Sequence, residues 1–278
     1  MYGVRLSNDQ SLIATVDRTG SIRFFDRELN PVSVINDAGS FSYGALHFSR
    51  NDLWVGVGNA DGVRVFDVES GRALWTGRDH QKPLYAVNFG ARDRTILSGG
   101  TDGVCYLWDL QADFGSEEWD PERLFSVLIR QEGRPAYAAY RQLAQTPEQT
   151  TALLTRKLAE IIKHPVSDSD VRRSIVALGA PSRKIAERAR TQLLDLGMAI
   201  YDQLSKHLEA GNLTERKRLM VKDLMRRISG RTRRVVALLA DLETQVADMS
   251  IDQLLQASRP GKLNGMLKEA KKRRESML

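Results

Sequence analysis

Three segments in the first 109 residues repeat one pattern, and this repeat constrains the fold more than any other feature of the chain. The segments end at Asp26, Asp67 and Asp109, so the period is 41 and then 42 residues. Short runs before each end alternate apolar and polar residues, as in Tyr85–Phe89. Alternation with a period of two indicates half-buried strands, so the N-terminal part is expected to form antiparallel sheets.

Tight turns separate the strands of each repeat. Asp17 and Asp61 are the turn aspartates of the first two repeats. Gly62 follows Asp61 directly and Gly20 lies three residues after Asp17, because the turn needs a positive φ. A period of about 40 to 45 residues with four short strands is typical of a β-propeller blade, which is stable only when neighbouring blades cover its faces. The sequence therefore predicts a partial propeller of about three blades over residues 1–112.

The third repeat resembles the WD40 family. It carries the family's polar set and its terminal dipeptide: His80, Ser98, Asp102 and Trp108-Asp109. The resemblance implies that His80, Ser98, Asp102 and Trp108 form a structural network of hydrogen bonds within one blade. The first two repeats depart from the family pattern, because Phe25 and Phe66 stand where it has tryptophan.

The same polar set also contains the residue types of a catalytic triad. A serine nucleophile needs an exposed oxygen on a strained Gly-x-Ser-x-Gly elbow, whereas Ser98 lies in Leu97-Ser98-Gly99 within a predicted strand. The chain also lacks the phosphate-loop, dinucleotide-binding and His-Glu-x-x-His zinc motifs. We therefore expect no catalytic residues, no cofactor and no metal site.

The predicted array has fewer blades than a closed propeller, which in known cases has at least four. Three alternatives remain open: the chain is part of a longer protein, another chain completes its propeller, or the array stays open. An unclosed array exposes strand edges and apolar faces, which favour self-association.

The composition changes near Gly115, which predicts a second domain. Residues 1–118 carry 11 basic and 16 acidic side chains, and the rest of the chain carries 30 and 19. All four tryptophans and seven of the eight phenylalanines lie in the first 119 residues. We therefore expect residues 113–119 to be a linker between two kinds of architecture.

From Asp120-Pro121 onward the apolar residues recur with a period of about 3.6, which indicates helices. Helix ends are expected at glycines such as Gly179 and Gly230, and helix caps at Thr214 and Ser250. Short connections between about eight or nine helices predict a HEAT- or armadillo-like array over residues 120–258. Residues 259–278 are expected to form a basic C-terminal helix or tail.

This region also resembles the helical segment that follows WD40 repeats in many planctomycete proteins. The resemblance rests on loose motifs in four stretches of the chain: residues 136–143, 146–154, 186–197 and 213–219. It implies binding or scaffolding and no catalytic residues.

A basic helical face suggests an alternative function. Its candidate contacts to nucleic-acid phosphates or other anions are Arg218, Lys222, Arg226, Arg227 and Arg231. Acidic residues are interspersed and no aromatic residues accompany the face, so a solvated helix surface explains it more simply.

The main functional hypothesis is a non-catalytic scaffold or adaptor that binds protein partners through its blades and its helical array. A second alternative is the regulatory C-terminal portion of a larger protein. The chain has one cysteine and no run of about 18 apolar residues, which favours a cytoplasmic protein without a membrane span.

Overall fold

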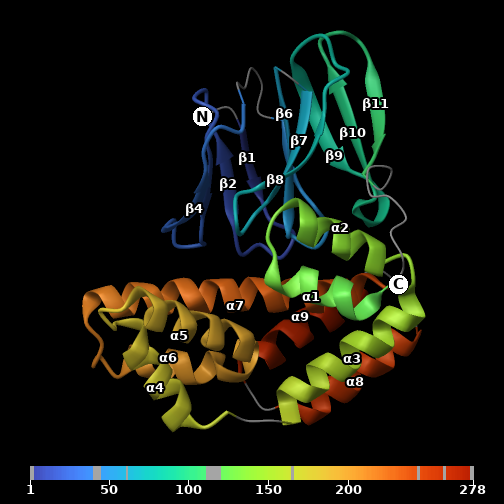
Figure 1. Cartoon of the computed structure of the whole chain (residues 1–278). Helices are drawn as coiled ribbons and strands as arrows, with labels where there is room; N and C mark the ends of the chain where they lie inside the picture. Colours follow the sequence, from blue (N-terminus) through green and yellow to red (C-terminus); the bar gives the residue numbers. More distant parts are fainter. Residues whose placement is uncertain are drawn as a thin grey trace. The chain divides into compact units, whose positions relative to one another are not determined.

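A computed structural model describes residues 3–39, 45–60, 62–110, 120–163, 166–242, 245–258 and 261–275. The chain divides into two compact units (Figure 1). The first unit contains residues 1–120 and 130–142, and the second contains residues 121–129 and 143–278. The predicted linker 113–119 and the predicted turn residue Asp61 lie outside the described residues.

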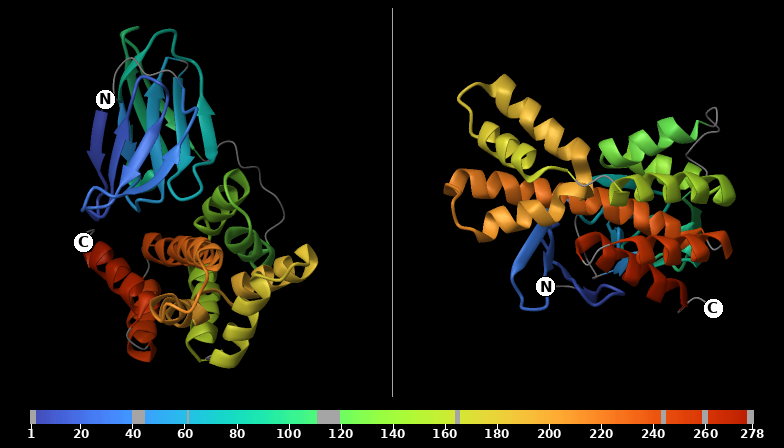
Figure 2. Two further views of the ribbon diagram at one scale, coloured as in Figure 1. Left: turned by 90° about the vertical axis from the view of Figure 1, so that its left-hand side faces the viewer. Right: turned by 90° about the horizontal axis from the view of Figure 1, so that it is seen from below.

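The first unit contains three antiparallel sheets, which lie side by side in Figure 1 and one behind another in the left view of Figure 2. The first sheet consists of β1 (Gly3–Leu6), β2 (Ile13–Val16), β3 (Ile22–Phe25) and β4 (Pro31–Ile35). The second consists of β5 (Leu46–Phe48), β6 (Trp54–Asn59), β7 (Gly62–Asp67) and β8 (Ala73–Gly77). The third consists of β9 (Leu84–Phe89), β10 (Thr95–Gly100) and β11 (Cys105–Asp109), with the short 3₁₀ helix η1 (Ala91–Asp93) between β9 and β10. The predicted blade-like sheets are thus confirmed, and in the described residues they do not close into a ring.

The turns between the second and third strands of each sheet need residues with positive φ. Gly20, Gly62 and Gly103 have φ angles of 82°, 125° and 75° in the three sheets. At Gly62 a Cβ atom would also lie 2.1 Å from the carbonyl oxygen of Gly77. Glycine therefore permits both the backbone conformation and the close approach of the neighbouring strand.

The second sheet is covered on both faces. Towards the first sheet, Phe48 packs edge-to-face on Phe24 with ring centroids 6.2 Å apart, within a continuous buried apolar cluster. Towards the third sheet, β6 presents Gly56 and Gly58, and a Cβ at Gly58 would lie 2.8 Å from the Cβ of Leu84. Small residues at these two positions let the second and third sheets approach closely.

The helices of the chain follow the sheets. Their bounds are α1 (Pro121–Arg130), α2 (Arg134–Leu143), α3 (Pro147–Lys163), α4 (Asp168–Leu178), α5 (Arg183–Leu196), η2 (Gly197–Ile200), α6 (Tyr201–Glu209), α7 (Glu215–Asp241), α8 (Gln245–Ala257) and α9 (Lys262–Glu275). The second unit is entirely helical in its described residues, as predicted. Most of α2 belongs to the first unit, with the sheets.

Two expected helix boundaries are wrong. Helix α7 runs through Gly230 without a break, and Ser250 lies inside α8 instead of capping it. Apolar residues on both sides of Gly230 are buried, among them Ile228 and Val235, so packing offsets the cost of about 1 kcal/mol that glycine brings to a helix interior. Thr214 does occupy the N-cap position of α7, and Ser182 occupies that of α5.

Several helix contacts join elements that are distant in sequence. Helix α3 packs on α8, and α9 packs on α7 as well as on its neighbour in sequence, α8. An array of stacked HEAT pairs would rely mainly on consecutive helices, as α4 and α5 do here. The all-helical prediction is confirmed, and the HEAT-like arrangement is not.

Candidate functional site

The predicted polar set of the third repeat lies in one chain of hydrogen bonds. His80 precedes β9, Ser98 lies in β10, Asp102 lies in the β10–β11 turn and Trp108 lies in β11. His80 Nε2 is 2.8 Å from Ser98 Oγ, and His80 Nδ1 is 2.9 Å from a carboxylate oxygen of Asp102. Trp108 Nε1 donates to Ser98 Oγ at 2.7 Å. The hydrogen bond from His80 is the main reason that the pKa of Asp102 lies below its ordinary value.

The order Asp–His–Ser matches that of a hydrolase triad, but the environment differs from that of a nucleophile. Ser98 is 1% exposed, and the His80 side chain is fully buried. Ser98 Oγ accepts the N–H of Trp108 and also forms a hydrogen bond with His80 Nε2. The serine oxygen is thus enclosed and doubly hydrogen-bonded, whereas a nucleophile needs an open approach for its substrate.

The turn aspartate Asp17 is held in a similar local network. Its carboxylate accepts hydrogen bonds from the Thr19 hydroxyl at 2.5 Å and from the backbone N–H of Thr19 at 2.9 Å. It also pairs with Arg23. The Thr19 hydroxyl, followed by Arg23, holds the pKa of Asp17 well below its ordinary value. The contacts order the β2–β3 turn, as local carboxylate–backbone bonds do elsewhere.

The outward surface of the first sheet carries exposed apolar side chains beside an arginine. Strand pairing places Leu6 opposite Ile13 and Ile13 opposite Phe25, and Ala14 and Phe24 of the same strands point towards the second sheet. We call this outward surface the first-sheet face: Val4, Leu6, Ile13, Thr15, Arg23 and Phe25. Val4 and Leu6 are exposed large hydrophobic residues.

The outward surface of the third sheet carries exposed apolar side chains as well. Leu97 lies opposite Leu107, and Gly99 lies opposite Cys105. These four residues form the third-sheet face, on the side away from Ile96 and Val87, which pack against the second sheet. Leu97 and Leu107 are large exposed hydrophobic residues, and the Cys105 thiol is free and exposed.

Sequence reasoning missed an aromatic cluster that joins α2 to the sheets. The Trp54 ring, at the start of β6, makes edge-to-face contacts with Tyr137 and Tyr140, at centroid distances of 4.8 and 5.0 Å. Asn51, in the β5–β6 loop, donates to the Tyr140 hydroxyl at 3.2 Å. These contacts hold α2 against the end of the second sheet.

Arg141 extends the cluster to the third sheet. Its guanidinium lies 4.8 Å from the centre of the Trp54 ring, donates to the Tyr137 hydroxyl at 2.9 Å and donates to the carbonyl oxygen of Asp93 at the end of η1. Burial is the main cause of the raised pKa of Tyr137. The spacing of Tyr137, Tyr140 and Arg141 is the i, i+3, i+4 pattern of one helical face, which was the available signal.

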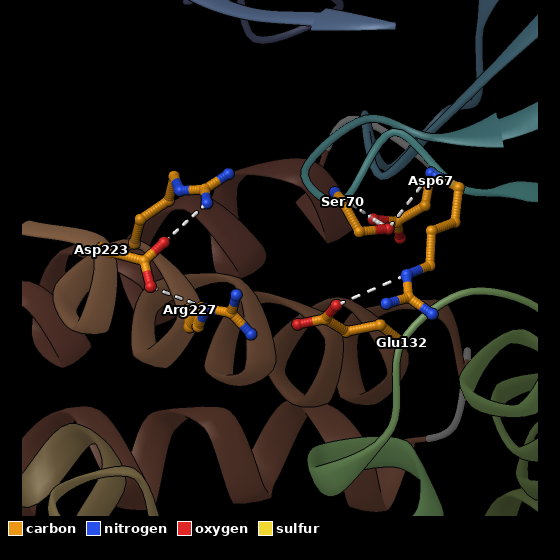
Figure 3. Close-up of polar contacts among 7 residues, drawn as sticks. Asp67, Ser70, Glu132, Asp223 and Arg227 are labelled. Atoms are coloured by element: carbon orange, nitrogen blue, oxygen red, sulfur yellow. Dashed lines mark hydrogen bonds and ion pairs between the residues drawn. The ribbon is translucent and has the colours of Figure 1, made fainter. Parts of the chain in front are cut away.

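The basic residues of α7 are partly neutralised by neighbouring acids. Asp223 accepts from Arg227 at 3.0 Å, as Figure 3 shows, and from Arg226 at 2.8 Å. Burial opposes the charged form of Asp223, but these two arginines prevail and the pKa of Asp223 is lowered. Arg218 pairs with Glu215, and Lys222 is exposed.

Figure 3 also shows the carboxylate of Asp67, at the end of β7, in contact with Ser70. Ser70 donates to Asp67 through its hydroxyl and its backbone N–H, both at 2.7 Å. The β7–β8 turn is therefore ordered by the aspartate that ends the second repeat, much as Asp17 orders the β2–β3 turn.

The third repeat of the first unit, which carries the polar network, is similar to a WD40 repeat. The family model described as WD domain, G-beta repeat, matches residues 71–109. Among solved structures, the crystal structure of RRP9 WD40 repeats is similar at 18% identity and a TM-score of 0.36; the match covers 38% of this chain and about a third of the other (34%). No curated protein matches the chain. The similarity of the helical region to planctomycete proteins is not confirmed.

The matched segment starts before β8 and ends with β11, so the sequence repeat contributes one strand to the second sheet and three strands to the third. WD40 repeats generally mediate protein–protein interactions. No helix in the described parts of the chain has the length and apolarity needed to cross a membrane.

Proposed function

We propose that the chain is a non-catalytic cytoplasmic scaffold that binds protein partners through the first-sheet face and the third-sheet face. The observation that supports this most directly is the exposure of Leu6 and Leu107, at 52% and 69%. Their counterparts in the second sheet, Phe48 and Val65, are 3% and 0% exposed because the neighbouring sheets cover them. Contiguous exposed apolar residues of this kind mark interaction surfaces.

The buried polar network supports the third-sheet face in this proposal. His80, Ser98 and Asp102 link the segment before β9 to β10 and to the β10–β11 turn, and Trp108 fixes β11. A satisfied buried network restricts the strands to one arrangement. The face is thereby presented on a rigid sheet, which lowers the entropic cost of binding.

The nucleic-acid alternative has weaker support. Within the candidate set on α7, Arg226 and Arg227 share the carboxylate of Asp223, and Arg218 pairs with Glu215. Phosphate contacts would have to replace these internal pairs. The alternative predicts binding to a DNA or RNA oligonucleotide that falls steeply with salt and is abolished by Lys222→Glu with Arg226→Glu.

The proposal is tested by capturing proteins from an extract of the source cells at moderate salt. The baits are the wild-type chain and the double variant Leu6→Glu with Leu107→Glu. Leu29→Glu is the matched control, since Leu29 is also an exposed leucine (66%) but lies in the β3–β4 turn and belongs to neither face. We expect a set of proteins, other than the chain itself, that binds the wild type and the control and is lost with the double variant. Capture that is identical for all three baits would contradict the proposal.

A further inference from the structure

The three sheets place equivalent residues on equivalent faces. Ala14 lies opposite Phe24 in the first sheet, Gly56 lies opposite Val65 in the second, and Leu97 lies opposite Leu107 in the third. In the first sheet this face is buried against the second sheet, and in the second sheet it is buried against the third. In the third sheet it is the exposed third-sheet face.

The opposite face of each sheet is buried in the second and third sheets and, in the described residues, is left without a covering sheet in the first. In the second sheet, Leu46, Phe48, Val55 and Phe66 are buried against the first sheet. In the third sheet, Val87 and Ile96 occupy equivalent positions and are buried against the second sheet. In the first sheet, the equivalent residues are those of the first-sheet face, which has no sheet on it in the described chain.

The chain thus displays, at its two ends, the two halves of an interface that it forms twice internally. We propose that the third-sheet face of one copy packs on the first-sheet face of a second copy, so that the chain self-associates head to tail. This inference rests on the proposed function, because it names a second copy as the partner of the same two faces. A contact between different surfaces is heterologous, so it either closes into a ring or continues as an open series.

Each internal interface has a polar contact made by a loop aspartate, and the first sheet has a different residue at the equivalent position. Asp52 accepts the backbone N–H groups of Asn8 and Asp9 from the first sheet, at 2.8 and 3.0 Å. Asp93 accepts the backbone N–H of Arg50 from the second sheet, at 2.9 and 3.0 Å to its two oxygens. Each acceptor lies in the loop between the first two strands of its sheet and has a positive φ, of 57° and 53°.

The equivalent loop residue of the first sheet is Gln10, with a φ of 58°. Its amide offers one neutral acceptor oxygen where Asp52 and Asp93 offer two charged ones. Hydrogen bonds to a charged acceptor are stronger than those to a neutral one. The junction between copies is therefore weaker than the two internal junctions, and Gln10→Asp converts it to the internal type.

The test measures the solution mass of the full chain by sedimentation velocity and by light scattering over a range of concentrations. The wild type is expected to form dimers or larger assemblies, and Leu107→Glu and Leu6→Glu are each expected to weaken association by more than about 100-fold. Both side chains are exposed in the single chain, so neither variant should impair folding. Leu29→Glu is the control and should assemble as the wild type does.

Mixing the two face variants separates head-to-tail contact from any symmetric one. A Leu107→Glu chain keeps its first-sheet face and a Leu6→Glu chain keeps its third-sheet face, so the mixture should form a one-to-one dimer although neither variant associates alone. Gln10→Asp should tighten association about tenfold. Reaction of the Cys105 thiol with a maleimide should slow with rising wild-type concentration and stay fast in Leu107→Glu.

A wild type that stays monomeric at all concentrations, or a mixture that forms no heterodimer, would overturn self-association. Neither result would contradict the scaffold proposal if proteins captured from the extract are still lost when both faces are substituted. Conversely, capture that is unchanged when both faces are substituted would refute the scaffold proposal even if the purified chain assembles.

Discussion

Replacing Tyr140 tests whether α2 is an integral part of the sheet unit. The Tyr140 side chain is 2% exposed, packs edge-to-face on Trp54 and accepts a hydrogen bond from Asn51. Tyr140→Ala removes the whole ring and should destabilise the first unit by about 3–5 kcal/mol, of which the aromatic pair contributes about 0.5–1.5 kcal/mol. Tyr140→Phe removes only the hydroxyl and should cost about 1 kcal/mol.

The assay uses the uneven distribution of tryptophan. All four tryptophans lie in residues 1–119, so tryptophan fluorescence in urea follows the sheets, whereas far-ultraviolet circular dichroism is dominated by the helices. Tyr201→Ala, in α6 of the second unit, is the control and should leave the fluorescence transition unchanged. The reasoning is refuted if Tyr140→Ala shifts the fluorescence-detected free energy of unfolding by less than about 1 kcal/mol, because α2 would then contribute little to the sheets.

Three further predictions concern the core and the surface. Ser98→Ala leaves the buried His80 and the half-buried Trp108 without this hydrogen-bonding partner and should lower the free energy of unfolding, measured by fluorescence in urea, by about 1–3 kcal/mol. Gly58→Ala brings a Cβ to 2.8 Å from Leu84 and should cost about 1–3 kcal/mol in the same assay; an unchanged midpoint would show that the sheets are not in tight contact. The hydrogen bond from Arg274 lowers the pKa of Asp248, so this pair should stabilise the helical unit above the ordinary aspartate pKa of about 4. The stabilisation should be lost as the pH falls through the lowered pKa. Thermal unfolding followed by circular dichroism from about pH 6 to 2 should therefore depend less on pH in Asp248→Asn than in the wild type.

The strands and most helices follow from local signals in the sequence. The alternating run Tyr85–Phe89 lies in β9, and Gly62 provides the tight turn before β7, because both features depend on residues close in the chain. The position of α2 and the continuity of α7 depend on packing between residues distant in the chain. Trp54 and Tyr140 are 86 residues apart, and no periodicity connects them, so the position of α2 with the sheets was not predictable. The same holds for Gly230, whose signal as a helix end is overridden by burial of the helix around it.

The polar set of the third repeat was predicted by resemblance, and the structure brings its four members within hydrogen-bond distance. Its structural role stays a prediction until Ser98→Ala is measured. The candidate anion contacts on α7 were less predictable than the polar set, because a basic stretch in sequence does not reveal which cations a nearby carboxylate pairs with. Asp223 shares its two oxygens between Arg226 and Arg227, and this pairing is visible only in three dimensions.

The sequence repeats and the sheets do not have the same boundaries, and this difference bears on assembly. Each repeat that ends at Asp67 or Asp109 begins with a strand, β4 or β8, that completes the sheet of the repeat before it. Neighbouring sheets are therefore joined covalently as well as by packing. The third sheet has three strands in the described chain, and no described strand pairs with the outer edge of β11. A strand added there would extend the same sheet whose outward side is the third-sheet face, and backbone pairing would supplement apolar contact at one site. The edge of β11 and the third-sheet face together make the third sheet better suited than the first-sheet face to bind an extended segment or another sheet.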